Sequence, residues 1–310
     1  MKALEIDYTM TLEFSNPVND HYFLLRCVPV SRGCQTVTSR NLEINPAVPV
    51  NCFSDVFGNI SYQGYAGENH NVFSFHSKAT VITDAASGSR EPCPPLYKYS
   101  TPLTRCTENM KEFMYEIFEG TKFFDSIQKK LVSKKEIRSV VELLRNAVHS
   151  RIKYTPNSTN VKTSAAEAFE AGKGVCQDYA HILCALCREC GIPARYVAGT
   201  SRGEGTTHAW TEYFVPDEQF IKKDGTPLSG KWSGADPTRN KFTDDTYVIL
   251  AAGRDFSDCR VDTGIFRGTA DQTMTVFVKT TELPLPEGRN TRAQEKRFLS
   301  LEELKKQQQQ

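Results

Sequence analysis

The chain has 310 residues, of which 39% are hydrophobic and 24% are charged. Both values are typical of a folded soluble protein, and the length is sufficient for two domains. The net charge is only +1, which indicates no general attraction to nucleic acid or to a membrane surface. No apolar run approaches the ~20 residues that a membrane-spanning helix requires. We therefore expect neither nucleic-acid nor membrane partners, and the sequence leaves the oligomeric state unknown.

The first residues, MKALEID, alternate charged and apolar side chains, whereas a signal peptide has a continuous apolar core. A cytoplasmic location is the expectation that follows. The chain has ten cysteines, and without a secretory signal they are expected to be free thiols rather than a disulfide framework.

The first 85 residues are rich in strand patterns. Residues 4–14 alternate apolar and polar side chains, which predicts a strand with one buried face. Shorter strands are predicted at 21–30, 35–44, 59–63 and 72–81, separated by Gly, Pro and Asn turn signals. We therefore predict an antiparallel β-sandwich over residues 1–85. Its histidines are expected to stand apart from one another on polar faces; they are His21, His70 and His76.

The rest of the chain changes character. Residues 86–106 are rich in Pro, Gly and Ser and are interpreted as a linker. Residues 137–148 repeat apolar side chains at helical spacing, and Ser164 with Glu167 forms a capping pattern before a short helix. Strands are predicted at 194–198, 208–215, 247–250 and 273–278. Residues 107–283 are therefore expected to form an α+β domain, and 284–310, charged and ending in glutamines, a solvated tail.

The sequence GKGVCQDYAH over residues 172–181 leads into a predicted helix that ends before Gly191 and Pro193. Cys176 is thus expected at the N-terminus of a helix, where unpaired N–H groups and the helix dipole favour a thiolate. A thiolate in this position is a potential nucleophile. The alternative is a small apolar residue buried at the start of a helix.

Two residues downstream can complete a site around Cys176. His208 begins the strand-like run HAWTEYFV, and Asp236 lies in ADPT. A thiol nucleophile requires a base, and the base requires a group that fixes its orientation. The gaps of 32 (208 − 176) and 28 (236 − 208) residues suit a helix followed by two neighbouring strands. Alternatively, Asp236 is only the turn residue of an Asp-Pro pair.

Other polar residues near the predicted helix are less suitable. His181 lies about 500° around the helix from Cys176, so it is expected to pack beneath the helix. Cys184, Cys187 and Cys190 form a CxxCxxC pattern, but the last lies about 600° around from the first, so the three cannot converge on one metal ion. They are expected to be buried. No calcium-loop pattern is present in the sequence, so we predict neither a metal nor a cofactor.

Five blocks in order carry a family resemblance: GVCQDYAH, GIPARYVAG, HAWTEYF, ADPT and AAGRDFSD. They resemble the bacterial transglutaminase-like family of papain-type thiol enzymes. The resemblance covers roughly residues 100–280, and residues 1–90 resemble the β-rich N-terminal region of such proteins. It implies an α+β fold with a transglutaminase-like catalytic domain behind the β-sandwich. It also implies Cys176 as nucleophile, His208 as general acid and base, and Asp236 as the residue that orients His208.

The oxyanion of such a reaction needs hydrogen-bond donors. The backbone N–H of Cys176 is one natural donor, because it opens a helix. Tyr154 is our candidate for the second donor, the alternative being a tyrosine of the core or of a substrate groove. Trp210 and Trp232 flank the proposed triad and either shape a cleft or fill the core.

The expected activity is thiol-dependent acyl transfer on amide bonds of a peptide, a protein or an amidated small molecule. We favour hydrolysis, as in a cysteine peptidase or amidase, because water is the acceptor unless a site excludes it. A protein-glutamine transglutaminase would use the same triad. A catalytically inert binding module of the same fold is the third possibility, and its mark would be a missing triad residue.

Overall fold

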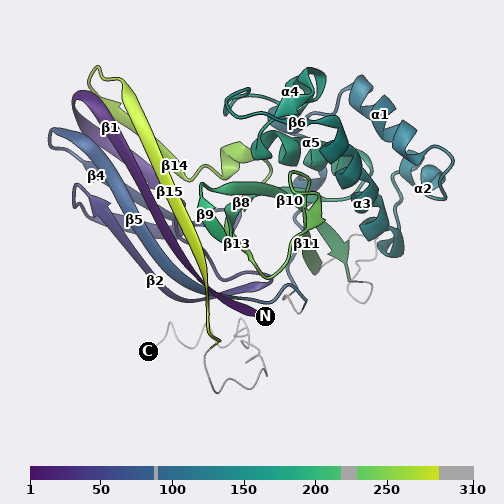
Figure 1. Cartoon of the computed structure of the whole chain (residues 1–310), viewed down its shortest axis with the longest axis horizontal. Coiled ribbons are helices and arrows are strands. Elements are labelled where there is room, and N and C mark those ends of the chain that lie inside the picture. Colours follow the sequence, from purple (N-terminus) through teal and green to yellow (C-terminus); the bar gives the residue numbers. More distant parts are fainter. Residues whose placement is uncertain (87–89, 218–228, 286–310) are drawn as a thin grey trace, which may run out of the picture.

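The computed structural model describes residues 1–86, 90–217 and 229–285. The fold has three layers, a curled antiparallel sheet, a smaller sheet and a group of helices, which follow one another from left to right in Figure 1. Residues 87–89 of the expected linker and residues 286–310 of the expected tail lie outside the described part. Among the described helices, none is both long enough and apolar enough to cross a membrane.

The curled sheet has eight strands, and β1 runs through both of its halves. β1 (Lys2–Leu25) is central: its first half pairs with β5 and β15, and its second half pairs with β4 and β14. The strand order is β2-β5-β1-β15-β9 in one half, with β3, β4 and β14 completing the other half. Their bounds are β2 (Gln35–Asn45), β3 (Val50–Ser54), β4 (Ile60–Ala66), β5 (His70–Thr83), β9 (Gly203–Gly205), β14 (Asp262–Arg267) and β15 (Gln272–Leu283).

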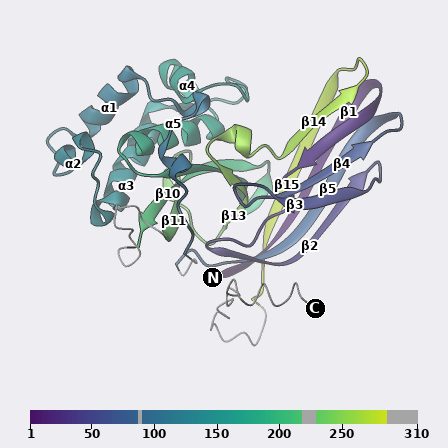
Figure 2. The same ribbon diagram turned by 180° about the vertical axis from the view of Figure 1, so that it is seen from behind.

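Irregular pairing in the middle of β1 explains the curl. The register with β5 shifts between Glu13 and Val18, and the register with β14 shifts between Asn19 and Tyr22. Asp20, in the same region, has a left-handed backbone with φ of 47°. Extra residues in one strand of a pair bend the strand and increase its twist. The sheet therefore curls into a half-barrel, which Figure 2 shows from behind.

The half-barrel differs from the sandwich that we predicted for residues 1–85. The alternation in residues 4–14 did produce a buried face, as expected, since all six apolar side chains from Leu4 to Phe14 are buried. They pack, however, in one cluster with Val248 and Leu250 of the second sheet and with Val278 of β15. The strand pattern showed that one face is buried but could not show what covers it.

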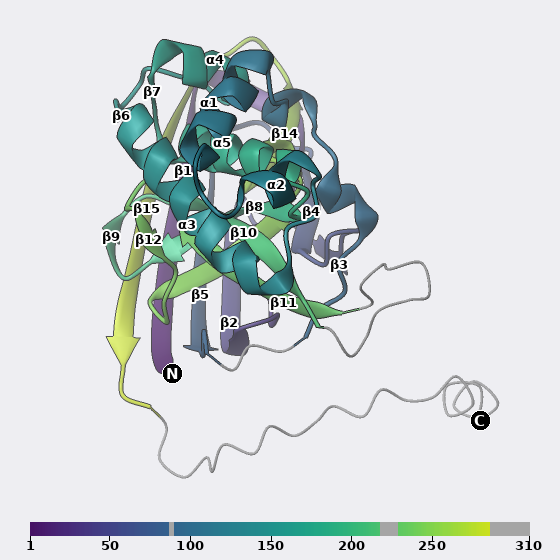
Figure 3. The ribbon, with the colours of Figure 1, turned by 90° about the vertical axis from the view of Figure 1, so that its right-hand side faces the viewer.

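The second sheet is antiparallel with the order β12-β11-β10-β8-β13. Its strands are β8 (Ala194–Ser201), β10 (His208–Pro216), β11 (Gly230–Asp236), β12 (Lys241–Phe242) and β13 (Tyr247–Gly253). The helices lie in front of this sheet in Figure 3, with the half-barrel behind it. They are α1 (Glu108–Phe118), α2 (Phe124–Gln128), α3 (Lys134–Arg151), α4 (Ala165–Ala171) and α5 (Cys176–Glu189).

Short elements connect these layers. β6 (Lys153–Tyr154) and β7 (Lys173–Gly174) form a parallel pair, and three 3-10 turns cover Pro95–Lys98, Pro102–Thr104 and Phe256–Asp258. The expected helix over 137–148 lies within α3, and Ser164 caps α4 together with Glu167 as predicted. Helices followed by an antiparallel sheet are present within residues 107–283, as expected. Three strands of the same range, β9, β14 and β15, belong instead to the half-barrel, so the expected domain is not a separate unit over these bounds.

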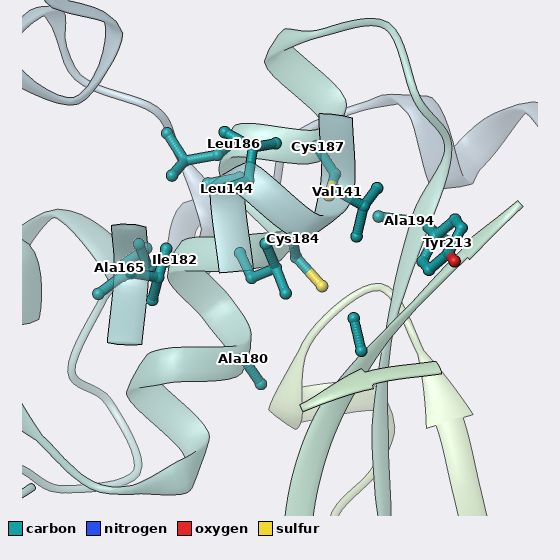
Figure 4. Packing of buried hydrophobic residues seen from close by; sticks show 14 of the residues in the cluster. Val141, Leu144, Ala165, Ala180, Ile182, Cys184, Leu186, Cys187, Ala194 and Tyr213 are labelled. Carbon is teal, nitrogen blue, oxygen red and sulfur yellow. The ribbon is translucent and has the colours of Figure 1, made fainter. Parts of the chain in front are cut away.

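Helix α5 is the centre of the main core and is buried along nearly its whole length. Side chains of α3, α4 and the second sheet surround it in Figure 4. The three cysteines of the CxxCxxC pattern are fully buried, and the sulfurs meet different neighbours. Cys184 Sγ donates to Thr211 Oγ1 at 3.5 Å, while Cys190 Sγ lies 3.4 Å from the sulfur of Met114.

The expectation that the histidines of the first sheet stand apart is wrong for two of them. His21 is only 2% exposed, and its Nδ1 lies 3.2 Å from Nε2 of His70. The two rings stack at 5.4 Å because the bend in β1 brings the start of β5 beside it. His76 lies on the outer face as expected and pairs with Asp7 at 2.9 Å.

Gly64 provides a test of the half-barrel packing. The ring of Phe23, which pairs with Gly64 across β1 and β4, occupies the space where a Cβ at position 64 would lie. We expect Gly64→Ala to lower the free energy of unfolding by about 1–3 kcal/mol, because the overlap forces Phe23 or the strands to move. Gly67→Ala is the matched control, since its Cβ would meet only the exposed Tyr65 side chain, at 3.1 Å. Equal denaturation midpoints for the two variants would contradict this packing.

Candidate active site

The start of α5 is locked in place by a buried carboxylate. Asp178, fully buried, accepts hydrogen bonds from the backbone N–H of Val175 at 2.7 Å and from Oγ1 of Thr159 at 2.6 Å. Burial raises the pKa of Asp178, although these hydrogen bonds oppose the shift. A Cβ at Gly174 would lie 2.6 Å from Asp178 Oδ2, so only glycine fits there. The sequence thus fixes Cys176, the first residue of α5, at a defined helix N-terminus.

His208 and Asp236 are brought together by neighbouring strands. His208 is the first residue of β10 and Asp236 is the last of β11, which pairs with β10 in antiparallel fashion. His208 Nε2 lies 2.7 Å from Asp236 Oδ2. The His208 side chain is 11% exposed, whereas that of Asp236 is completely buried. The expected arrangement of a helix followed by two neighbouring strands is therefore present.

Asp236 has its two oxygens fully engaged. Oδ2 accepts from His208 and from the Tyr247 hydroxyl, the latter at 2.8 Å. Oδ1 accepts from the backbone N–H groups of Thr238 at 2.9 Å and Arg239 at 3.1 Å. Burial alone would raise the pKa of Asp236, but these donors outweigh burial and hold it below its usual value. The group is therefore a carboxylate at neutral pH.

The pKa of the His208 imidazole is raised, whereas that of Asp236 is lowered. Burial alone would lower the pKa of His208, but hydrogen bonding and charge interaction with Asp236 and Cys176 raise it to about 9. Because Asp236 bonds Nε2, the other ring nitrogen is left for the thiol. A protonated imidazole between a carboxylate and a thiol is the arrangement that stabilises a thiolate.

The loop that carries Asp236 is anchored on helix α3. His149 Nδ1 lies 3.0 Å from the carbonyl oxygen of Pro237, and Arg145 Nε donates to Asn240 Oδ1 at 3.1 Å. Asn240 adopts a left-handed backbone with φ of 51°, which asparagine tolerates better than most residues. The Asp-Pro turn, considered as an alternative to a site residue, therefore exists and positions the carboxylate.

Tyr154 lies beside the residues that precede Cys176, because β6 pairs it with Gly174 of β7. Its side chain is 52% exposed. Partial burial and the nearby Cys176 thiol raise the pKa of Tyr154, so the hydroxyl keeps its proton and can donate. The geometry is compatible with an oxyanion donor, and that role stays a prediction.

The remaining residues named from the sequence lie outside the immediate cluster. His181 lies on the buried face of α5, as expected, and accepts a hydrogen bond at Nε2 from the backbone N–H of Phe256. Burial lowers the pKa of His181 to about 4. Trp210 lies beside His208, with ring centroids 6.3 Å apart, whereas Trp232 stacks on Arg195 instead.

Sequence reasoning missed two supports of the site, Tyr247 and Asp178. Tyr247 was only part of a predicted strand, and its bond to Asp236 joins strands that are not neighbours, so no local pattern indicates it. Asp178 had a signal: it is the third residue of a helix, where a carboxylate can accept from the N-cap N–H.

The chain was compared with known proteins and solved structures. Residues 125–225 match the transglutaminase-like superfamily, and residues 4–82 match the bacterial transglutaminase-like N-terminal region. These matches confirm the resemblance seen in the sequence. An uncharacterized protein of Mycobacterium leprae is 25% identical over 91% of this chain and 100% of its own length. A protein-glutamine gamma-glutamyltransferase of Pseudomonas aeruginosa is 32% identical, over 28% of this chain and 15% of its own length.

Among solved structures, a candidate cysteine protease from Cytophaga hutchinsonii shares the fold. Its TM-score is 0.61 at 23% identity, and the similarity covers 92% of each chain. This structural similarity shows that the two chains share the fold.

The environment of the thiols predicts which one reacts first. Cys34, Cys93 and Cys106 have a pKa raised to about 12 by burial. Cys176 is partly exposed and lies next to His208, while Cys52 is exposed at the half-barrel edge. We expect substoichiometric iodoacetamide at pH 7 to label Cys176 at least about tenfold faster than Cys52. Peptide mapping measures both rates, and His208→Gln should slow only Cys176. Preferential labelling of the buried cysteines of α5 would contradict the expectation that Cys176 is the most reactive thiol.

Proposed function

We propose that this chain, which carries a transglutaminase-like core behind the N-terminal region of bacterial transglutaminase-like proteins, catalyses thiol-dependent hydrolysis of amide bonds. The observation that carries the proposal is the 2.7 Å hydrogen bond from His208 to the buried Asp236, next to Cys176 at a helix N-terminus. All three residue types are present, which argues against the inert binding module.

In the acylation step, the Cys176 thiolate attacks the carbonyl carbon of the amide. The new S–C bond forms while the carbonyl π electrons move onto oxygen. When the carbonyl re-forms, the C–N bond breaks and the nitrogen takes the proton held by His208. The amine leaves and a thioester on Cys176 remains. A pKa of about 9 for His208 suits this step, because the imidazole is protonated at neutral pH and can transfer its proton to the leaving nitrogen.

The developing oxyanion would be stabilised by N–H groups at the start of α5, which lack intrahelical acceptors. We propose the Tyr154 hydroxyl as the second donor, because strand pairing holds Tyr154 beside Gly174, two residues before Cys176. Asp236 does not bond the substrate in this scheme; it fixes the imidazole and stabilises its charged form.

In the second step, water attacks the thioester and gives its proton to His208. The C–S bond breaks, the acid is released and the thiolate–imidazolium pair returns. A primary amine in place of water would give a new amide, which is the transglutaminase outcome. Two observations support water: Cys176 is partly exposed and Tyr154 is half exposed, so the site does not exclude solvent. The similarity to a glutamyltransferase keeps amine transfer as the second candidate.

A screen of peptides and amidated amino acids, with and without an added primary amine, tests the proposal. We expect release of free acid and ammonia or amine, loss of that release in Cys176→Ala, and little incorporation of the added amine. Incorporation that exceeds hydrolysis at millimolar amine would instead establish the transferase. Turnover that persists in Cys176→Ala would remove the thiol mechanism altogether.

Asp236→Asn separates the orienting role from the chemical steps. We expect its rate loss to be about 10- to 100-fold smaller than that of Cys176→Ala, since the nucleophile and base remain. The buried amide would also face four donors, so a decrease in stability of about 1–3 kcal/mol is expected. Activity is therefore measured well below the melting temperature of the variant. Unchanged turnover would show that Asp236 is only a turn residue.

A further inference from the structure

One oxygen of Asp236 accepts hydrogen bonds from two donors that belong to different strands of the second sheet, β10 and β13. Oδ2 accepts from His208 Nε2 at 2.7 Å and from the Tyr247 hydroxyl at 2.8 Å. We propose that Tyr247 is a positioning residue that shares this oxygen with His208 and so limits how firmly Asp236 holds the imidazole proton. The inference rests on the proposed function, since it concerns the same proton transfer.

Packing fixes the direction of the Tyr247 hydroxyl. Tyr247 opens β13, and the strand order places β8 and β10 between β13 and the β11 strand of Asp236. Trp210 contacts Tyr247 edge-on, with ring centroids 5.2 Å apart and an interplanar angle of 80°. Gly199 of β8 makes this possible, because a Cβ there would overlap the Trp210 ring and the Val248 carbonyl oxygen. The hydroxyl thus reaches across two strands with little freedom.

The shared oxygen has a chemical consequence. Burial, and then the charge of Asp236, raise the pKa of Tyr247, so the hydroxyl stays protonated and donates to the carboxylate. A carboxylate oxygen that accepts a second hydrogen bond has less negative charge available for its first partner. Asp236 therefore supports the imidazolium of His208 without holding the proton so firmly that the leaving amine cannot receive it. A general acid is most effective when its pKa lies near the working pH.

The other charged groups around this oxygen can be kept constant. Arg239 and Lys241 lie over the Tyr247 ring at 5.6 and 5.1 Å, and Arg239 Nε is 4.0 Å from Asp236 Oδ2. Arg145 of α3 also interacts with Asp236 through its charge. The Cys176 thiol faces His208 from α5. Arg239 also hydrogen-bonds the Tyr247 hydroxyl. Tyr247→Phe keeps all of these charged groups and the ring that Trp210 packs against, and it removes only the hydroxyl with its bonds to Asp236 and Arg239.

The first measurement needs no substrate. In protein with isotope-labelled histidine, the NMR titration of the His208 imidazole is followed in wild type, Tyr247→Phe and Tyr65→Phe, with His208→Gln assigning the signal. Tyr65 is the matched control, because its hydroxyl also donates to a carboxylate, Asp20 at 2.5 Å, in the distant half-barrel. We expect the midpoint of the His208 titration to rise by about one pH unit in Tyr247→Phe, which is a tenfold change in proton affinity. The midpoint should stay unchanged in Tyr65→Phe.

The second measurement uses an amide substrate. In Tyr247→Phe, kcat should fall about two- to tenfold with KM unchanged, because a less acidic imidazolium protonates the leaving amine more slowly.

An unchanged or lowered midpoint of the His208 titration would overturn the inference and leave Tyr247 as a packing residue. If Tyr247→Phe does not fold, 3-fluorotyrosine at position 247, a stronger donor, should lower the midpoint; no decrease would again overturn it. A raised midpoint in a protein without amidase turnover would preserve the inference while the proposed function failed.

Discussion

The structure around the site depends on one buried carboxylate. Asp236 is removed from water and accepts four hydrogen bonds, two from backbone N–H groups and two from the side chains of His208 and Tyr247. A buried charge is costly unless donors surround it, so every element that supplies a donor is held in one arrangement. The turn after β11, the start of β10 and the start of β13 are fixed together in this way. The orientation of the His208 imidazole follows from this arrangement and is therefore set before a substrate binds.

The half-barrel contributes to the same arrangement although it supplies no residue to the cluster. Its buried face packs on Val248 and Leu250 of β13, the strand that begins with Tyr247. Its strand β15 also pairs with β9, three residues before His208, and Lys279 of β15 binds Glu204 at 2.7 Å. The strand that carries Tyr247 and the segment that precedes His208 are thus both held by the first sheet. On the other side, α3 holds the loop after Asp236 through Arg145 and His149.

Local patterns in the sequence correctly predicted those features that depend only on neighbouring residues. The helix start at Cys176, the strand at His208 and the buried face of residues 4–14 follow from capping, residue type and alternation. Long-range pairing could not be predicted, because β15 joins β1 across most of the chain. The Asn and Pro residues at 15–20 predicted a break between two strands, whereas the structure has a bend within one strand. The sandwich expectation failed for this reason. The bond from Tyr247 to Asp236 was missed because it joins strands that are not adjacent.

The central claim is that Cys176 forms a covalent acyl intermediate with the help of His208. The most direct measurement is the intact mass of the protein, followed by peptide mapping, after brief reaction with a nitrophenyl ester of a small acyl group. A single acyl group on Cys176 is predicted, absent in Cys176→Ala and formed at least about 100-fold more slowly in His208→Gln. Acylation at another residue, or equal rates in wild type and His208→Gln, would contradict the account.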